Sequence, residues 1–286
     1  MKIDTTTVYV FLDNFYQEFV KTEASYHLPG KKTTRVPGLS LSEILTILIL
    51  YSFSPCKNFK FYYHTCITTH DFPNKVSYQR FIELIPRAFP LLCFLSQSLL
   101  KEPADGEYYM DSTHLAVCHN KRIFHHQVFD GLATRGKSSM GWFFGFKLHL
   151  IIDTKGDIMD IKFTPGNVDD RAVVDDMTVE LIGKLYADRG YISAELFKKL
   201  WQRGLHLVTG IKKNMTNLPA HFYDKIMLRK RALIETVFGY LKNNFNIEHT
   251  RHRSPCNAFA HMISALIAYM MKPTKPTIST PYWIQG

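Results

Sequence analysis

Apolar side chains recur at helical spacing through the first hundred residues. The first set has members three or four positions apart, namely Val8, Phe11, Leu12, Phe15 and Phe19. A second helix is predicted to start at residues 40–43, where Ser-Leu-Ser-Glu has the form of a capping box. A third is predicted over residues 77–85, with Pro86 and Pro90 breaking the chain before the apolar run 91–100. This pattern predicts an all-α N-terminal region.

After Pro103 the pattern changes to short runs rich in β-branched and aromatic residues. Five runs are predicted as strands: residues 107–111, 144–153, 158–164, 184–187 and 205–209. Residues 153–157 form a predicted tight turn, so the second and third strands make a hairpin. A helical pattern over residues 193–203 separates the last two strands, as in a parallel βα unit. The fold class predicted is α/β, with a mixed five-stranded sheet flanked by helices.

The remaining patterns complete the predicted organisation. Further helices are predicted over residues 170–183, 226–244 and 256–271. A Pro-rich stretch begins at residue 273 and predicts a loose tail. The chain is therefore expected to consist of three parts: a helical region over residues 1–100, an α/β domain over 104–272 and a tail over 273–286.

Composition narrows the class of protein. The chain has 286 residues, of which 46% are apolar, and this predicts a globular protein with a large core. A formal charge of +10 favours a polyanionic partner such as nucleic acid. Five widely spaced cysteines lack the pattern of a disulfide framework or zinc site, so reduced thiols are expected. The N-terminal residues lack the layout of a secretory signal, and no apolar run is long enough to span a bilayer.

Three acidic residues lie in settings that suit a metal site. Asp111 follows the apolar-leaning run 108–110, Asp188 follows 185–187, and Glu235 lies within a helical pattern. Carboxylates at two strand ends, and on a helix packed beside the sheet, can meet at one point. Oxygen ligands suit Mg²⁺ and Mn²⁺, and paired ions promote phosphoryl transfer. Taken singly, each residue also fits a solvated acid on a loop or helix.

The order of the predicted elements around these acids is that of a ribonuclease-H-like nucleotidyl-transfer core. Six motifs carry a wider resemblance: Tyr-Met-Asp-Ser-Thr at 109–113, Gly-Trp-Phe-Phe-Gly-Phe-Lys-Leu-His at 141–149, Gly-Asn-Val-Asp-Asp-Arg at 166–171, Ala-Asp-Arg-Gly-Tyr at 187–191, Lys-Arg-Ala-Leu-Ile-Glu-Thr-Val-Phe at 230–238 and His-Thr-Arg-His-Arg-Ser at 249–254. On these motifs the chain resembles the DDE transposases of bacterial insertion sequences. The resemblance is close to the insertion sequence 982 family, which is related to the insertion sequence 4 group, and it spans residues 41–269.

The resemblance implies roles for individual residues. The three acids Asp111, Asp188 and Glu235 would form the catalytic and metal-binding triad, with two Mg²⁺ or Mn²⁺ ions as cofactors. The related group also has Tyr, Arg, Glu and Lys in a fixed spacing. Arg231 and Lys242 fit that spacing around the Glu, whereas a leucine, at position 228, occupies the Tyr place.

The spacing of these helix residues has a physical sense of its own. Arg231 and Glu235 are four apart and share a helix face, and Lys242, seven beyond Glu235, is predicted to return to it. Here the acid would hold a metal ion while Arg231 and Lys242 contact DNA phosphates. The alternative is that Arg231 and Glu235 make a surface ion pair worth a few tenths of a kcal/mol.

Other polar residues near the predicted sheet have two interpretations each. Lys147 and His149 alternate with leucines on one strand, so they share a polar face. Lys147 is predicted to contact DNA; His149 either approaches the active centre or is a buried, hydrogen-bonded residue. Arg189, in the sharp turn after Asp188, is predicted to contact the DNA backbone. Three residues after Pro165 are predicted to cap a helix, with the last as an additional acid near the metals in the alternative interpretation: Asn167, Asp169 and Asp170.

Basic and aromatic groups add candidates for DNA binding. Three basic clusters occur: Lys31, Lys32 and Arg35; Lys212, Lys213, Lys225, Arg229, Lys230 and Arg231; and His249, Arg251, His252 and Arg253. Phosphate contacts from Lys230, Arg251 and Arg253 would give a salt-sensitive affinity, although such clusters are also ordinary solvated faces. One aromatic group is predicted to pack in the sheet core, with stacking on a flipped DNA base as the alternative: Trp142, Phe143, Phe144 and Phe146.

Together these observations predict a DNA transposase that cleaves the ends of a mobile element and joins the released 3′ end to target DNA. Both steps are phosphoryl transfers that need no covalent protein intermediate. The helical region is predicted to bind the terminal inverted repeats, and the pairing of two ends predicts a homodimer on DNA. The expected location is the bacterial cytoplasm, at the nucleoid. The alternatives are a metal-dependent nuclease on the same fold and a non-catalytic DNA-binding relic.

Overall fold

The computed structural model describes residues 4–26, 38–103, 106–138, 141–211, 221–249 and 251–278. Two compact units make up the chain, and both are discontinuous in sequence. The first unit comprises residues 1–99, 241–247 and 252–271. The second comprises residues 100–240, 248–251 and 272–286.

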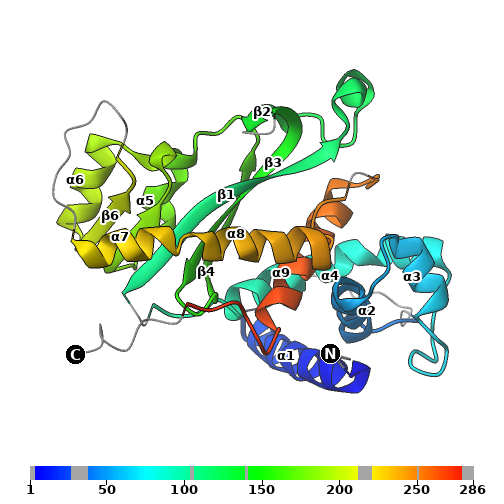
Figure 1. Cartoon of the computed structure of the whole chain (residues 1–286). Helices are drawn as coiled ribbons and strands as arrows, with labels where there is room; N and C mark the ends of the chain where they lie inside the picture. Colours follow the sequence, from blue (N-terminus) through cyan, green and yellow to red (C-terminus); the bar gives the residue numbers. More distant parts are fainter. Residues whose placement is uncertain are drawn as a thin grey trace. The chain divides into compact units, whose positions relative to one another are not determined.

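The first unit is built from helices, as the pattern of its N-terminal residues predicts. Its α-helices are α1 (Thr5–Tyr26), α2 (Leu41–Phe53), α3 (Phe59–Thr65), α4 (Tyr78–Ser98) and α9 (Pro255–Met270), labelled in Figure 1. The predicted capping box at the start of α2 is confirmed, because Ser40 Oγ accepts from Glu43 N at 3.1 Å and Glu43 Oε2 accepts from Ser40 N at 2.6 Å. Helix α9 packs on α2 and α4, although the sequence patterns group its residues with the sheet.

Helix α4 corrects one expectation from the sequence. Pro86 and Pro90 were expected to break the chain, but the helix runs through both. Both rings are exposed on the outer side of the helix. Pro86 cannot donate to the carbonyl of Ile82, and Asn257 Nδ2 from α9 donates to that oxygen instead, at 3.2 Å. The hydrogen bond that proline removes is thus replaced from a neighbouring helix.

A six-stranded mixed sheet forms the centre of the described second unit. Its strands are β1 (Glu107–Cys118), β2 (Thr134–Ser138), β3 (Gly141–Asp153), β4 (Ile158–Pro165), β5 (Gly183–Ala187) and β6 (Leu205–Thr209). They follow the order β2-β3-β1-β5-β6, with β4 also paired to β3. The predicted hairpin is confirmed as antiparallel β3 and β4, and the predicted βα unit as parallel β5 and β6. The strand missed from the sequence is β2, because Thr-Arg-Gly-Lys-Ser has the polarity of a loop.

Helices cover both faces of this sheet. Alternating β1 residues Tyr108 and Met110 point to a core shared with α5 (Val174–Met177) and α6 (Ala194–Gln202). On the opposite face lie α7 (Phe222–Arg229) and α8 (Ala232–Gly239), which follow one another along the sheet in Figure 1, and Tyr109 Oη donates to Met227 O at 3.3 Å.

Two predicted segments differ in detail from the structure. The helix expected over 170–183 is only the 3₁₀ turn η2 (Asp170–Val173) followed by α5. At the end of α5 the Thr178 hydroxyl donates to Val174 O at 2.7 Å. The helix expected over 226–244 is divided at Lys230 and Arg231, and it continues past α8 as the π-helical turn η4 (Tyr240–Asn244). These short segments are shaped by packing on the sheet rather than by the period of their apolar residues.

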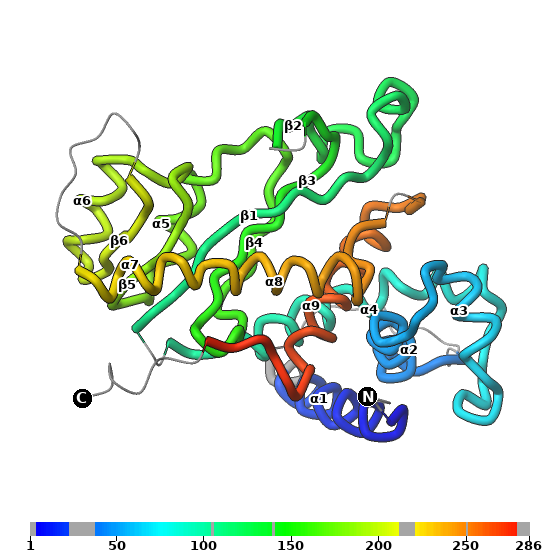
Figure 2. The backbone as a smooth tube through the Cα atoms, in the orientation of Figure 1, coloured from blue at the N-terminus to red at the C-terminus, as the bar shows by residue number. Residues whose placement is uncertain are grey.

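The chain path in Figure 2 shows two further features of the second unit. Between β1 and β2 the chain makes an excursion over residues 119–133, which includes the 3₁₀ turn η1 (Asn120–His125) and extends past the end of the sheet. The first residues of the predicted loose tail are held to the sheet, since Lys275 pairs with Asp157 at 2.6 Å and Ile278 N donates to Thr154 O at 2.9 Å. Among the described helices, none has the length and apolar character needed to cross a membrane.

Candidate active site

Asp111 lies where strand β1 loses its parallel neighbour. The register pairs Tyr109 with Tyr186, and β5 ends directly before Asp188, so Asp188 follows at the level of Asp111. The expectation that Asp111 itself ends a strand is wrong, because β1 continues to Cys118 in antiparallel pairing with β3. The end of β5, not of β1, opens the sheet beside the Asp111 carboxylate.

A single guanidinium joins two of the three predicted acids. Arg231 Nη1 lies 2.8 Å from Asp111 Oδ2, and Arg231 Nη2 lies 2.9 Å from Glu235 Oε1. Arg231 is the N-cap residue of α8 and Glu235 lies in the first turn, so the break between α7 and α8 sets the position of this side chain. The planar fork of arginine suits two carboxylates at once. The side chains of Arg231 and Asp111 are only 21% and 22% exposed, so this is more than a solvated surface pair.

The charges of both other acids reach Asp111. Its pKa is raised to about 6, chiefly by burial, with the negative charges of Asp188 and Glu235 adding to the rise. The N–H of Ser112, 2.8 Å from Asp111 Oδ1, and the charge of Arg231 act in the opposite direction. Asp111 is therefore the least solvated carboxylate of a cluster of three acids and one cation.

Asp188 stays exposed, as the turn that follows it predicts. It precedes the 3₁₀ turn η3 (Arg189–Tyr191), and its backbone carbonyl accepts from Tyr191 N at 3.0 Å. Tyr191 is buried, and burial, followed by the charges of Asp111 and Asp170, raises the pKa of its hydroxyl. Sequence reasoning missed Tyr191 as a neighbour of the acids; an aromatic residue directly after Asp-Arg-Gly was the available signal.

The donor chemistry of the cluster fits a hard divalent cation, since all three acids offer oxygen ligands. Within the described residues, however, no three His, Cys, Asp or Glu side chains stand close enough together to hold a metal ion as they are placed. Arg231 lies against Asp111 and Glu235 in this arrangement and supplies positive charge there. Binding of a cation by these carboxylates would therefore require Arg231 to give up at least one contact.

Lys147 and His149 lie on the opposite face of the sheet from Asp111. The register pairs His149 with Ser112, and because neighbouring residues of a strand alternate between faces, Asp111 points the other way. Lys147 Nζ contacts Asp170 Oδ1 at 2.9 Å, and His149 Nε2 lies 2.9 Å from the hydroxyl of Thr164. His149 is fully buried, and burial lowers its pKa to about 4. The buried, hydrogen-bonded interpretation of His149 is the one that agrees with the structure.

The predicted capping residues divide into three roles. Asp169 caps the turn η2, since its Oδ1 accepts from Arg171 N at 2.9 Å. Asn167 instead accepts from the Thr134 hydroxyl at 2.8 Å and so joins β4 to the edge strand β2. Asp170 pairs with Lys147. The capping prediction is therefore confirmed for Asp169 alone.

The remaining residues predicted to bind DNA are divided between the two units. Arg189, Lys230 and Arg251 belong to the second unit, whereas Lys242 and Arg253 belong to the first. Arg189 and Arg251 are exposed. Their contacts with DNA, like that of Lys147, stay predictions. Five members of the basic clusters lie outside the described residues: Lys31, Lys32, Arg35, Lys212 and Lys213.

The aromatic group on β3 is divided between core and surface. Phe143 and Phe146 are 5% and 4% exposed, which confirms core packing for both. Trp142 is 54% exposed, so core packing is wrong for this residue. The reason is its position near the start of β3, opposite Lys137 on the edge strand β2.

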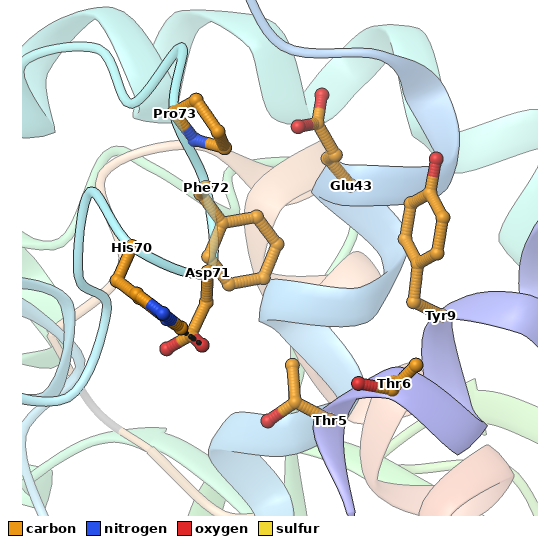
Figure 3. A pocket seen from close by; sticks show the side chains of 8 residues that line it. All are labelled: Thr5, Thr6, Tyr9, Glu43, His70, Asp71, Phe72 and Pro73. Atoms are coloured by element: carbon orange, nitrogen blue, oxygen red, sulfur yellow. Dashed lines mark hydrogen bonds and ion pairs between the residues drawn. The ribbon is translucent and has the colours of Figure 1, made fainter.

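The first unit contains a cavity of its own, with a volume of about 390 Å³. Figure 3 shows side chains from α1, α2 and the loop between α3 and α4 around it: Thr5, Thr6, Tyr9, Glu43, His70, Asp71, Phe72 and Pro73. The dashed line in Figure 3 is the contact between His70 Nδ1 and Asp71 Oδ1, at 3.3 Å. The Glu43 carboxylate already accepts from Ser40 N, so it is committed to the helix cap. The cavity contains none of the predicted catalytic residues.

Comparison with known proteins identifies the family. The model of a family described as the transposase DDE domain matches residues 101–255. Among solved structures, the chain is similar to the piggyBac transposase in a synaptic complex with hairpin DNA, with a TM-score of 0.54 and 10% identity over 89% of this chain and 70% of that one. The Mos1 mariner paired end complex with Mn aligns over 92% of this chain and 88% of that one, but its TM-score of 0.25, at 11% identity, is too low to support an argument. No curated protein matches the sequence.

The similarity to piggyBac supports the fold alone, and it agrees with the predicted ribonuclease-H-like α/β sheet flanked by helices. The family match covers more than half of the chain and includes Asp111, Asp188 and Glu235. On this match, the chain belongs to the DDE transposase domain family and is a DNA transposase.

Proposed function

We propose that this transposase cuts DNA at the ends of a mobile element and joins the released 3′ end to target DNA, with Asp111, Asp188 and Glu235 as its catalytic carboxylates. The observation that carries the proposal is the guanidinium of Arg231 shared by Asp111 and Glu235, together with the negative charges of Asp188 and Glu235 that raise the pKa of Asp111. A carboxylate whose pKa is raised by burial and by two neighbouring negative charges is costly to keep, which is typical of a functional site rather than of a structural one.

The chain's own residues divide the work at the proposed site. The three carboxylates would hold Mg²⁺ or Mn²⁺, two ions in our proposal, which when bound supply Lewis acidity for phosphoryl transfer. Arg231 provides positive charge beside Asp111 and would serve a phosphate oxygen of the DNA once released from a carboxylate. Asp188 is exposed at the sheet opening and so lies where a DNA backbone has access. The burial of Asp111 limits the water around the reacting phosphate.

Finer assignments rest on the motifs of the sequence. Within the DDE transposases we assign the chain to the insertion sequence 982 family, and we expect it to act in a bacterial cytoplasm at the nucleoid. We assign recognition of terminal inverted repeats to residues 1–100, whose buried core makes a stable helical platform. Pairing of two DNA ends implies a homodimer, which the molar mass of the protein–DNA complex in light scattering would reveal; a monomer on two ends would contradict it.

Substitution of one carboxylate tests the assignment. Asp111→Asn keeps the side-chain shape and removes the charge, so we expect metal-dependent cleavage of an element-end duplex to fall by at least about 1,000-fold while binding changes little. Glu195→Gln is the matched control, because Glu195 is an exposed acid on α6. Cleavage by Asp111→Asn at the normal rate would remove Asp111 from the mechanism. Adding a supercoiled target separates the two enzyme classes, since joined products indicate transposition and cleavage without joining indicates a nuclease.

A further inference from the structure

A basic and aromatic surface lies on the same sheet face as the proposed active site. The edge strand β2 pairs Arg135 with Phe144 and Lys137 with Trp142, so these four side chains share a face. Steps of two along β3 lead from Trp142 to Leu150, and Leu150 pairs with Asp111. Strand twist turns this face gradually along β3, but the face is continuous.

The two cations of this surface are held by an indole rather than by acids. The Arg135 guanidinium lies 5.2 Å from the centre of the Trp142 ring, and Lys137 Nζ lies 5.8 Å from it. Cation–π contacts of this kind position a charge without neutralising it. In the described segments neither cation has a carboxylate partner, and the Trp142 ring is 54% exposed.

The neighbouring excursion adds charge of the same sign. Asn120 Nδ2 donates to Trp142 O at 2.6 Å, which ties the turn η1 to the start of β3. Lys121 and Arg122 in that turn are exposed. Between positions 119 and 142, four Lys or Arg residues stand against one acid, Asp130. The segment therefore carries a net positive charge.

Charge on an edge strand also protects that edge from pairing with another chain. Protection of an edge needs only a charged side chain. Arg135 and Lys137 instead both lie over the exposed Trp142 ring, and the turn η1 adds Lys121 and Arg122, so edge protection alone does not explain the arrangement. Trp142 and Leu150 are eight positions apart on β3, which at the rise of a strand is roughly 26 Å. Along a duplex with 3.4 Å per base pair, that distance is about seven or eight base pairs.

We propose that this surface, formed by Arg135, Lys137 and Trp142 with the turn η1, is a second contact for the backbone of duplex DNA, about seven or eight base pairs from the phosphate at the carboxylates. The inference rests on the proposed function, because it takes the position of the reacting phosphate from Asp111. Arg135 and Lys137 bind backbone phosphates, and the indole of Trp142 keeps both cations directed to one side of β2. The partner is recognised by charge, so the contact is independent of base sequence.

The test is the salt dependence of binding to a fluorescein-labelled 30-base-pair duplex of random sequence, followed by anisotropy between 50 and 200 mM KCl. The double variant Arg135→Gln and Lys137→Gln should lower the slope of log K against log salt by about 1.8, from two phosphates at about 0.9 each. The matched double control, Lys101→Gln and Lys198→Gln, removes the same charge from exposed lysines outside this surface. We expect the slope of this control to stay close to that of the unmodified protein. Trp142→Ala keeps both charges and should change the affinity by less than about threefold, since only their positioning is lost.

A slope for the double variant equal to that of the control would overturn the proposal. So would a loss confined to a single-stranded 30-mer, or an altered oligomeric mass with unchanged DNA binding, which would mark the surface as an interface between copies of the chain. Because binding is measured rather than cleavage, these outcomes are independent of the Asp111→Asn test, and either proposal can fail while the other stands.

Discussion

The two faces of strands β1 and β3 carry charged groups in contrasting surroundings. On the α8 face, Arg231 is shared by Asp111 and by Glu235, whose side chain is 57% exposed. On the α5 face, Lys147 is 15% exposed and pairs with Asp170, which is 33% exposed. The contact between Arg231 and Glu235 is open to water, so it contributes little to stability and exchanges easily, whereas the Arg231–Asp111 and Lys147–Asp170 contacts are mostly buried and costly to break. The first arrangement suits binding and the second suits support.

The largest expected effect comes from breaking the supporting pair. Asp170→Ala removes the carboxylate partner of the Lys147 ammonium and leaves, among its described contacts, the Val168 carbonyl at 2.8 Å, so we expect the free energy of unfolding to fall by roughly 2–3 kcal/mol. Asp176→Ala is the control, because Asp176 pairs with Lys162 but is 75% exposed, and its loss should cost under about 0.5 kcal/mol. Urea unfolding at pH 7.5 measures both values. Equal losses would remove the contrast between supporting and solvated pairs.

A pH titration sharpens the same contrast through His149. Its folded pKa of about 4 lies below the ordinary value of 6.5 because the ring is buried. Below pH 6.5 the unfolded chain takes up a proton that the folded chain refuses until about pH 4, so stability falls as the pH drops through this window. Between pH 8 and pH 5 the loss from this residue should be about 2 kcal/mol.

The variant His149→Gln isolates this contribution, because its amide can still bond the Thr164 hydroxyl but does not titrate. Urea unfolding of both proteins at pH 8 and pH 5 gives the difference, in which the other titrating groups cancel. If the variant lost as much stability as the original chain on acidification, His149 would not be the group held neutral by burial.

The smallest expected effect concerns the cluster of acids around Arg231. Arg231→Gln should lower the free energy of unfolding by about 1–2 kcal/mol, because Asp111 is only 22% exposed and loses a charged partner, whereas water reaches the more exposed Glu235. The Arg231 guanidinium is bound to the carboxylates of Asp111 and Glu235, so its removal should also raise their affinity for Mn²⁺ by about threefold to tenfold. Calorimetry without DNA measures this affinity. Arg171→Gln, which removes an exposed partner of Asp169, is the control. A weaker affinity would show that Arg231 organises the carboxylates instead of competing for them.

Local patterns in the sequence were sufficient to predict much of this fold. The capping box at residue 40, the turn at 153–157 and the βα unit around 193–203 each contain their own determinants within a few residues. Strand β2 and the continuous α4 were missed because their determinants are distant: β2 is specified by pairing with β3, and Pro86 is tolerated because Asn257 serves the carbonyl that it leaves.

The candidate site shows the same limit. The spacing of Arg231 and Glu235 predicts a shared helix face, and their contact at 2.9 Å agrees with it. The contact between Arg231 and Asp111 could not be predicted, because it depends on where the break between α7 and α8 falls against β1. Likewise, alternation along β3 placed Lys147 and His149 together, but only the register with β1 reveals which face carries Asp111.

The bond from Asn257 to the Ile82 carbonyl has a consequence for how the protein is made. Helix α4 leaves the ribosome long before α9 is synthesised. Until then the Ile82 carbonyl, four residues before Pro86, lacks the hydrogen bond from Asn257. The α2 and α4 surfaces that α9 covers remain open for the same period. Chains truncated before residue 255 would lack α9 and could not complete the core of the first unit. Folding of the N-terminal helices therefore depends on synthesis of nearly the whole chain.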